Sequence, residues 1–169
     1  MGRVKLFPSF PPTEEELDMI NNVMRVKKSS VPGAGRGVFT RRFLPKGTFI
    51  GYYRGKIIPD EKNPNTDYTL GIQDDSGTPL SICAKKYGNF TGLINCYTGS
   101  GHAANVNYMP NGRMETIADI QPGEELFADY GKNYWTGRQD MLYDMTLRLN
   151  DALRKTRRRI KKKGVDSKE

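Results

Sequence analysis

The sequence predicts a mainly β domain followed by one C-terminal helix. Between residues 26 and 130 the apolar runs are short, and Gly, Pro or Asn separates them every several residues, which is typical of short strands joined by tight turns. After Arg138, apolar residues instead recur at the three-, four- and seven-residue spacings of a helix face. No strand pattern alternates with a long helix pattern, which argues against a doubly wound α/β sheet.

Each element of the β region has a local signal. Thr13 followed by Glu16 forms a capping box, which predicts a short helix that ends near Met24, after an irregular arm over residues 1–12. Apolar, β-branched and aromatic runs predict strands from Val26 onward and over 48–53, 68–72 and 114–118. Turns are predicted where Pro presets φ or Gly accepts positive φ, at 45–47, 75–77, 110–112 and 122–123.

The last predicted element is an amphipathic helix from about residue 138. Its apolar stripe consists of Met141, Leu142, Met145, Leu149, Ala152 and Leu153. A stripe of this kind usually faces the core of its own domain, so we expect it to pack on the β region, with binding to a partner as the alternative. The helix is expected to continue into the basic C-terminal tail.

Positive charge is concentrated at the C-terminal end. The 169 residues, a length that suits one domain, carry a net charge of +8. Residues 154–169 hold nine Lys or Arg and two acids, whereas residues 1–153 hold 18 basic and 17 acidic residues. The run over 154–163 therefore predicts attraction to nucleic-acid phosphates or a nuclear-import signal, with a solvated helix end as the alternative.

Several classes of site are excluded by the sequence. Two cysteines, Cys83 and Cys96, and one histidine, His102, are too few for a disulfide framework or a zinc cluster, so no metal is expected. The glycine-rich stretch over 33–37 lacks the last glycine of a dinucleotide-binding fingerprint, because Val38 stands in its place. No apolar run is long enough to span a membrane, and no membrane partner is expected.

Three short motifs follow one another in a fixed order. They are the glycine loop Gly35-Arg-Gly37-Val-Phe39, the run Leu93-Ile-Asn95-Cys96, and the segment Gly123-Glu-Glu-Leu-Phe-Ala-Asp-Tyr130 that leads to Trp135. Together with the stretches at 44–50, 53–55 and 117–126, these motifs resemble the SET domain of protein lysine methyltransferases. The resemblance covers residues 24–136.

The resemblance implies a fold of several small β-sheets around a knot-like crossing, where the segments of Asn95 and Tyr130 meet. It divides the chain into an N-terminal arm with a short helix (1–23), the SET domain (24–136), and the C-terminal helix with its basic tail (137–169). No zinc-binding cysteine cluster flanks the domain, so the chain resembles a compact version without pre-SET or post-SET zinc. The helix from about residue 138 is expected to close that side of the site instead.

Binding of S-adenosylmethionine, with S-adenosylhomocysteine as product, is also implied by the resemblance. The implied cofactor-binding residues are Gly35, Arg36, Gly37, Tyr68, Asn95, Cys96, Tyr130 and Trp135. Trp135 would cover the adenine ring, and the glycine loop would let the backbone approach the cofactor. The implied catalytic residues are Tyr130, Tyr53 and Tyr68, of which the last two would line the passage for the target lysine.

The sequence departs from the family pattern just after Asn95. Cys96 and Tyr97 stand where the family usually has His-Ser, and the second asparagine, Asn105, comes four positions late. A longer loop is thermodynamically cheap, but it changes which groups face the adenine. A catalytically inactive SET-like chromatin-binding module is therefore an alternative function, and a basic-tailed nucleic-acid-binding β protein is another.

The function implied by the resemblance is methylation of lysine in a histone tail, in the nucleus or at host chromatin, with the cytoplasm as a second compartment. Nucleosomal DNA is the expected partner of 154–163. Ala128 stands two positions before Tyr130, where the family often sets the number of methyl groups, and its small side chain implies di- or trimethylation. Substrate selection is expected in 59–67, whose acidic residues are Asp60, Glu61 and Asp67.

Overall fold

The structure is a computed structural model that describes residues 3–59, 67–136 and 138–165. Its N-terminal part contains the predicted capping box. The Thr13 hydroxyl accepts a hydrogen bond from the Glu16 N–H (3.2 Å), and the Glu16 carboxylate accepts one from the Thr13 N–H (3.0 Å). Helix α1 (Glu14–Asp18) continues as a π-helical turn (Met19–Val23). The helical segment therefore ends where the sequence indicates.

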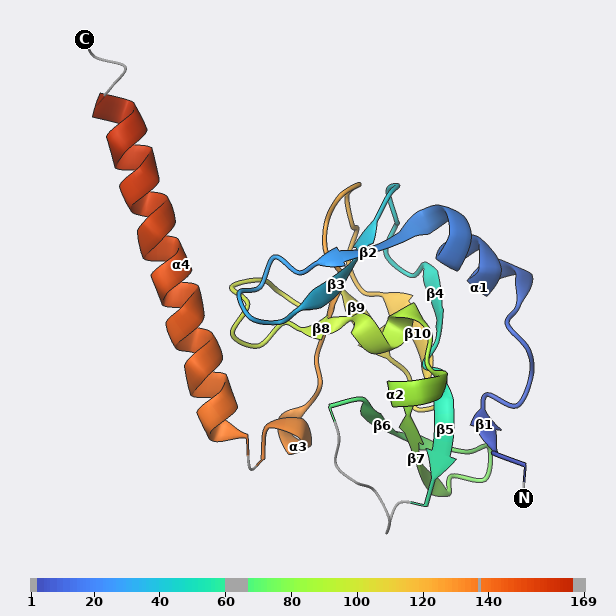
Figure 1. Ribbon diagram of the computed structural model, residues 1–169. Helices are drawn as coiled ribbons and strands as arrows, with labels where there is room; N and C mark the ends of the chain where they lie inside the picture. Colours follow the sequence, from blue (N-terminus) through green and yellow to red (C-terminus); the bar gives the residue numbers. More distant parts are fainter. Residues whose placement is uncertain (1–2, 60–66, 137, 166–169) are drawn as a thin grey trace.

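The β region consists of small sheets rather than one large sheet (Figure 1). The largest has the strand order β1–β5–β7–β6, with bounds Leu6–Phe7, Gly55–Ile58, Pro79–Cys83 and Thr69–Gln73. A second has the order β4–β10–β9, with bounds Phe49–Tyr52, Arg113–Thr116 and Val106–Tyr108. Two pairs complete the β region: β2 (Met24–Lys28) with β3 (Arg36–Thr40), and β8 (Asn95–Cys96) with β11 (Phe127–Ala128). This arrangement confirms the predicted fold class.

The predicted turns have the backbone that their glycines allow. The turn glycines at the four predicted sites have φ between 75° and 87°: Gly47, Gly77, Gly112 and Gly123. The predicted strands are found with small offsets, as β4, β6 and β10. The N-terminal arm differs from the expectation, because Leu6 and Phe7 pair with Lys56 and Gly55 to form the edge strand β1. This pairing was not readable from a stretch of 12 residues that contains three prolines.

The crossing implied by the sequence is formed by β8 and β11, which run parallel and pair Asn95 with Phe127 and Cys96 with Ala128. Asn105 locks the crossing from the other side. Its side-chain amide donates to the Glu125 carbonyl (2.9 Å), and its side-chain oxygen accepts from the Phe127 N–H (2.8 Å). Two segments about thirty residues apart are therefore held side by side.

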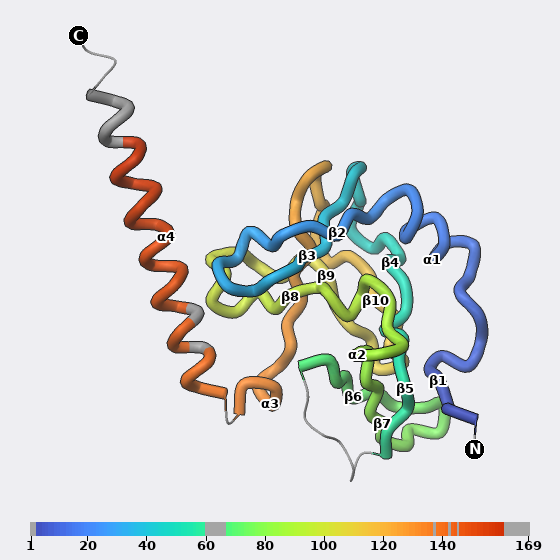
Figure 2. Tube along the Cα trace, viewed as in Figure 1, coloured from blue at the N-terminus to red at the C-terminus, as the bar shows by residue number. Residues whose placement is uncertain are grey.

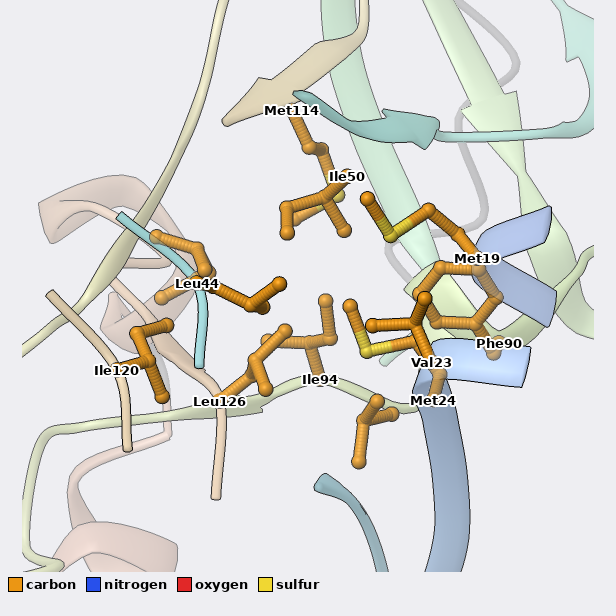
Figure 3. Close-up of a cluster of buried hydrophobic side chains, with 13 residues drawn as sticks. Met19, Val23, Met24, Leu44, Ile50, Phe90, Ile94, Met114, Ile120 and Leu126 are labelled. Carbon is orange, nitrogen blue, oxygen red and sulfur yellow. The ribbon is translucent and has the colours of Figure 1, made fainter. Parts of the chain in front are cut away.

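Buried apolar side chains join these sheets into one body (Figure 3). The main cluster draws residues from the π-helical turn after α1 and from several strands, and the residues with no exposed surface include Val23, Ile50, Ile94, Met114 and Leu126. Burial of such side chains is the dominant stabilising term of a domain this size. A smaller cluster of Tyr53, Ile72 and Ile82 lies under the four-stranded sheet.

A buried ion pair fixes the segment that carries Tyr53. The carboxylate of Glu16, which has no exposed surface, accepts hydrogen bonds from Arg54 at Nε (2.8 Å) and Nη2 (2.5 Å) and from the Tyr52 N–H (3.2 Å). Burial raises the pKa of Glu16, but the hydrogen bonds from Arg54 and the backbone outweigh that effect, so the net pKa is lowered. The carboxylate therefore stays charged and holds α1 against the β4–β5 turn.

Of the remaining helical segments, two lie between β7 and β8 and two follow β11. They are the short α2 (Ala84–Tyr87) and α3 (Lys132–Trp135), one 3-10 turn (Phe90–Leu93), and the long α4 (Gln139–Val165). α4 runs beside the body and extends beyond it (Figures 1 and 2). Among the described residues, no helix combines the length and the apolar character needed to cross a membrane.

The prediction that the apolar stripe of α4 packs on the β region is wrong for Met141 and Leu153, whereas Leu149 and Ala152 are half-buried. Met141 is 44% exposed and Leu153 is 47% exposed. Leu149 does approach the body, since its Cδ2 lies 3.7 Å from where a Cβ on Gly101 would be. The side chains of Leu142 and Met145 lie outside the described ones. Leu153 belongs to the second half of the helix, which projects past the sheets (Figure 1).

Candidate functional site

A cavity of about 560 Å³ lies where the crossing, the glycine loop and α4 meet. Seven predicted site residues line it: Gly35, Arg36, Tyr68, Asn95, Cys96, Tyr130 and Trp135. These residues come from segments spread over a hundred positions of the sequence. The motifs gave only their order along the chain, and the fold brings them to one cavity. Gly37 and Tyr53 do not line the cavity.

The glycine loop gives open access to the backbone at one position. Gly35 has φ 73°, and a Cβ added there would meet no atom within 4 Å. Gly37 has a different role from the expected one. A Cβ on Gly37 would lie 2.0 Å from Oε1 of Glu125, so this glycine makes room for a buried carboxylate rather than for a ligand.

Glu125 is a site-forming residue that the motifs did not single out. Its buried carboxylate accepts hydrogen bonds from the Ser29 hydroxyl (2.7 Å), from the Ser30 N–H (2.8 Å) and hydroxyl (2.5 Å), and from the Asn95 amide (3.3 Å). The Asn95 amide also donates to the Arg36 carbonyl (3.0 Å). Glu125 therefore ties the loop after β2 to the crossing and fixes the Asn95 side chain. The one local signal that could have pointed to Glu125 is its position next to the apolar run 126–128.

Tyr130 and Tyr53 both donate hydrogen bonds to backbone carbonyls. The Tyr130 hydroxyl donates to Ile94 (2.6 Å), and the Tyr53 hydroxyl donates to Tyr68 (2.8 Å). Burial, together with neighbouring phenol groups, raises the pKa of both tyrosines well above the usual value of about 10. Both hydroxyls therefore stay protonated and act as fixed hydrogen-bonding groups.

Tyr108 of β9 is a further aromatic residue that sequence reasoning missed. Its ring lies edge-on to Tyr53, with centroids 5.8 Å apart. It packs against the buried cluster that contains Ala128, and burial, with Tyr130 and Tyr53 nearby, raises its pKa well above the usual value. Tyr108 therefore packs against both Tyr53 and the cluster that contains Ala128.

Trp135 has a buried polar group without a partner. The ring packs edge-on against Tyr134, with centroids 4.9 Å apart. Within the described residues, its indole Nε1–H is shielded from solvent and no hydrogen-bond acceptor lies within reach. An unpaired buried donor is costly, so a ligand that brings an acceptor to the Trp135 side of the cavity is favoured.

Asp67 is already engaged by side chains at the cavity rim. Its carboxylate accepts a hydrogen bond from the Tyr134 hydroxyl (3.2 Å) and pairs with Arg138 (3.6 Å), whose guanidinium lies over the Tyr134 ring (4.3 Å). Burial and the Asp67 charge raise the pKa of Tyr134 to about 12. Asp67 is thus bound within the protein, while Asp60 and Glu61, the other acidic residues expected to attract a peptide, lie outside the described residues.

One face of α4 supplies the remaining side of the cavity. Met141, Asp144 and Arg148, spaced by three and four residues, line it together, and we call them the helix wall. Arg148 pairs with Asp144 (2.7 Å), and its Nη1 would lie 2.6 Å from a Cβ on Gly33. The guanidinium therefore rests on a glycine backbone at the loop opposite.

Metal chemistry has no visible donor set here. No group of three or more His, Cys, Asp or Glu side chains suited to a metal occurs in the described part of the chain. His102 stacks on Phe127 (4.9 Å between centroids), and the Cys96 thiol donates to the Thr98 hydroxyl (3.3 Å). These two residues have separate packing roles.

Known proteins that are similar to this chain include a domain family and several lysine methyltransferases. The SET domain family matches residues 35–131, which is more than half of the chain. The histone-lysine N-methyltransferase EZH2 of Chaetomium thermophilum is 26% identical over 122 residues, which cover 63% of this chain and 8% of that protein. The N-lysine methyltransferase KMT5A-A of Xenopus laevis is 30% identical over 135 residues, which cover 69% of this chain and 39% of that protein. The chain thus spans well under half the length of these relatives.

Solved structures give the same fold. The methyltransferase domain of human PR domain-containing protein 2 superposes with a TM-score of 0.57 at 24% identity, covering 70% of this chain and 84% of that one. The polycomb repressive complex 2 of Chaetomium thermophilum, bound to S-adenosylmethionine, superposes with a TM-score of 0.53 at 23% identity, covering 70% and 17%. The β8–β11 crossing and the family match over residues 35–131 agree, and the chain belongs to the SET domain family.

Proposed function

We propose that the protein is an S-adenosylmethionine-dependent protein lysine methyltransferase. The observation that carries the proposal is the convergence of Tyr130, Asn95 and Trp135 on one cavity at the crossing of a SET fold. Family membership supports the reaction class, and the names of the matched relatives support lysine as the acceptor. The site residues themselves support the division of roles given below.

The cavity has features that fit the cofactor. Gly35 leaves its backbone open, Asn95 is held in place by Glu125, and Trp135 presents a flat face with an unpaired N–H. Together with Arg36, Cys96 and Tyr68 these residues would hold S-adenosylmethionine, with stacking and hydrogen bonds directed to the adenosine part. When bound, S-adenosylmethionine supplies an electrophilic methyl group on its sulfonium and leaves as S-adenosylhomocysteine.

The tyrosines provide an environment for a neutral lysine amine. An amine free in water has a pKa of about 10.4, and both desolvation and a neighbouring positive charge lower it. Tyr130 would orient the amine lone pair in line with the methyl group, a positioning role that raises the rate without covalent chemistry. Its raised pKa argues against a role as base, because a tyrosinate would not form near neutral pH. Tyr53 and Tyr68 would line the approach of the lysine.

A histone tail is the proposed substrate, because relatives such as EZH2 of Chaetomium thermophilum carry histone lysine methylation in their names. The nucleus is the matching compartment, and the basic run 154–163 would contact nucleosomal DNA. Ala128 is fully buried and offers neither hydroxyl nor bulk, which supports di- or trimethylation as the end point. Selection of the target lysine would involve 59–67, most of which lies outside the described residues.

Incubation of the purified protein with labelled S-adenosylmethionine and a panel of histone peptides tests the proposal. Transfer of label to a lysine, mapped by mass spectrometry, is the expected result, and exhaustive conversion should give di- or trimethyl product. Monomethyl product alone would contradict the Ala128 argument but not the activity. Binding of S-adenosylhomocysteine without transfer to any histone would favour the inactive chromatin-binding alternative.

A further inference from the structure

Helix α4 carries two different surfaces, the helix wall and the basic run over 154–163. Its 27 residues extend over roughly 40 Å at 1.5 Å per residue. The helix wall lies in its first half and borders the cavity, whereas the basic run begins at Arg154 in its second half. Figure 1 shows that the second half projects away from the body. A change in the helical order of one half of α4 can therefore alter the helical order of the other half.

Two side chains in the described part of the first half lie against the body. Arg148 rests on Gly33, and Leu149 approaches Gly101 of the loop after β8. The polar members of this face stay open to solvent, since the side chains of Arg148 and Asp144 are 54% and 55% exposed. Elements with little buried surface detach at low free-energy cost, and the exposure of Met141, Asp144 and Arg148 favours docked and detached states of similar stability.

The second half carries positive charges that destabilise its helical conformation. Arg154, Lys155, Arg157, Arg158 and Arg159 include like-charged pairs at spacings of three and four residues, which destabilise a helix. Among these described side chains, only Lys155 pairs with an acid, Asp151 at 2.8 Å. The hydrogen bond from Lys155 and then the charges of Lys155, Arg154 and Arg158 lower the pKa of Asp151, which reflects the positive field of this segment.

We propose that α4 couples the cofactor cavity to nucleic acid, so that a duplex bound along the basic half raises the affinity of the cavity for the cofactor. Phosphates neutralise the repulsion within the basic half and thereby favour the helical state. Helix formation is cooperative, so the added order extends into the first half and holds Met141, Asp144 and Arg148 at the cavity. The coupling must be reciprocal, with the cofactor raising the affinity for the duplex by the same factor.

This inference rests on the proposed function, because it concerns the same cofactor cavity. The test is calorimetric binding of S-adenosylhomocysteine to the full chain with and without a short DNA duplex at low salt. We expect the duplex to tighten binding by about fivefold. The effect should fall at high salt, where the duplex dissociates.

Two variants at one position separate coupling from binding. Leu153→Pro interrupts the helix between its halves and should keep affinity for both ligands while abolishing the effect of one on the other. Leu153→Ala keeps the helix continuous and should retain the wild-type coupling. Equal coupling in Leu153→Pro and wild type would overturn the proposal.

The other outcomes are equally decisive. An affinity for S-adenosylhomocysteine that is unchanged by a bound duplex, or the absence of duplex binding, overturns the coupling and leaves the proposed methyltransferase function standing. Failure of S-adenosylhomocysteine to bind under any condition removes the proposed function and the coupling together. Polyglutamate that matches the effect of DNA would overturn nucleic acid as the partner.

Discussion

The cavity has two kinds of wall, and they differ in how they are held. The wall on the β body places Asn95 and Tyr130 through buried hydrogen bonds to Glu125 and to the Ile94 carbonyl. The helix wall on α4 consists of residues that are about half exposed, and of these Arg148 lies against the body at the Gly33 backbone. One wall is fixed by the core, and the other depends on the docking of a single helix.

The two walls are therefore expected to have different functions, with the β wall orienting the reacting groups and the helix wall closing over a bound molecule. Groups that orient a reacting amine need fixed positions, because small displacements lower the rate strongly. Groups that only close over a bound molecule tolerate movement and can respond to partners. Substitutions in the β wall are therefore expected to affect stability and turnover, whereas those on α4 are expected to affect neither unless they break the helix.

The largest expected effect is loss of stability on truncating the core beside the crossing. Leu126 has no exposed surface and belongs to the main apolar cluster. Leu126→Ala should lower the free energy of unfolding by about 3–4 kcal/mol, from lost burial and a residual cavity. Urea unfolding followed by circular dichroism measures it. A decrease in the free energy of unfolding below about 1 kcal/mol, as for a surface substitution, would contradict the prediction. It would mean that neighbouring side chains move to fill the space left by Leu126.

Truncation of Glu125 tests whether the polar network holds the β wall. Glu125→Ala leaves the donors of Ser29, Ser30 and Asn95 without their acceptor, which should cost about 3 kcal/mol of stability. The adjacent Glu124, which is exposed and accepts one hydrogen bond from the Gln121 N–H, is the matched control. Glu124→Ala should change stability by about 0.5 kcal/mol. Equal losses in the two variants would show that the network is not the stabilising feature.

Trp135→Ala tests the side of the cavity formed by α3, which lies in the chain between the β body and α4. Removal of a base-stacking aromatic should weaken S-adenosylhomocysteine binding by about 1–3 kcal/mol in calorimetry. Tyr143→Ala, which removes a 68% exposed aromatic from α4, is the control and should bind as the wild type does. A folded Trp135→Ala protein with unchanged affinity would assign Trp135 to packing alone.

Tyr130→Phe removes one hydroxyl from the β wall and keeps the ring. Methyl transfer should fall at least about tenfold, or roughly 1.4 kcal/mol in the barrier, because one fixed hydrogen bond no longer orients the site. Binding of S-adenosylhomocysteine should change little. Tyr87→Phe, at an exposed tyrosine on α2, is the control. Turnover in Tyr130→Phe that equals the wild type would refute the orienting role.

The predictable part of the fold came from local signals. The capping box of Thr13 and the positive-φ turn glycines depend on neighbours within a few residues, and both are found as expected. The motif residues around Asn95 and Tyr130 were placed by their resemblance to a family, and they do meet at one crossing. The division of the chain at residues 24 and 136 stays a prediction.

The unpredicted part depends on contacts between distant residues. The bond from Ser29 to Glu125 joins positions 96 apart, and no local pattern announces such a partner. For the same reason Gly37 was assigned to a ligand, although its missing Cβ makes room for the Glu125 carboxylate. Tyr108 was missed because a lone tyrosine in a short strand looks like packing until its neighbours Tyr53 and Tyr130 are known.

The smallest expected effect completes the comparison with a leucine of α4 outside the helix wall. Leu153 is 47% exposed and follows the helix wall by a little over one turn. Leu153→Ala keeps the helix propensity and removes a side chain that buries little apolar surface, so the free energy of unfolding should change by less than about 0.5 kcal/mol. The same chemical change at Leu126 should cost several times more, because there the side chain is enclosed by the core. Urea unfolding of the two variants side by side measures the contrast. A loss at Leu153 comparable to the loss at Leu126 would mean that α4 packs against a partner surface in solution, and the separation between a fixed wall and a docked wall would then fail.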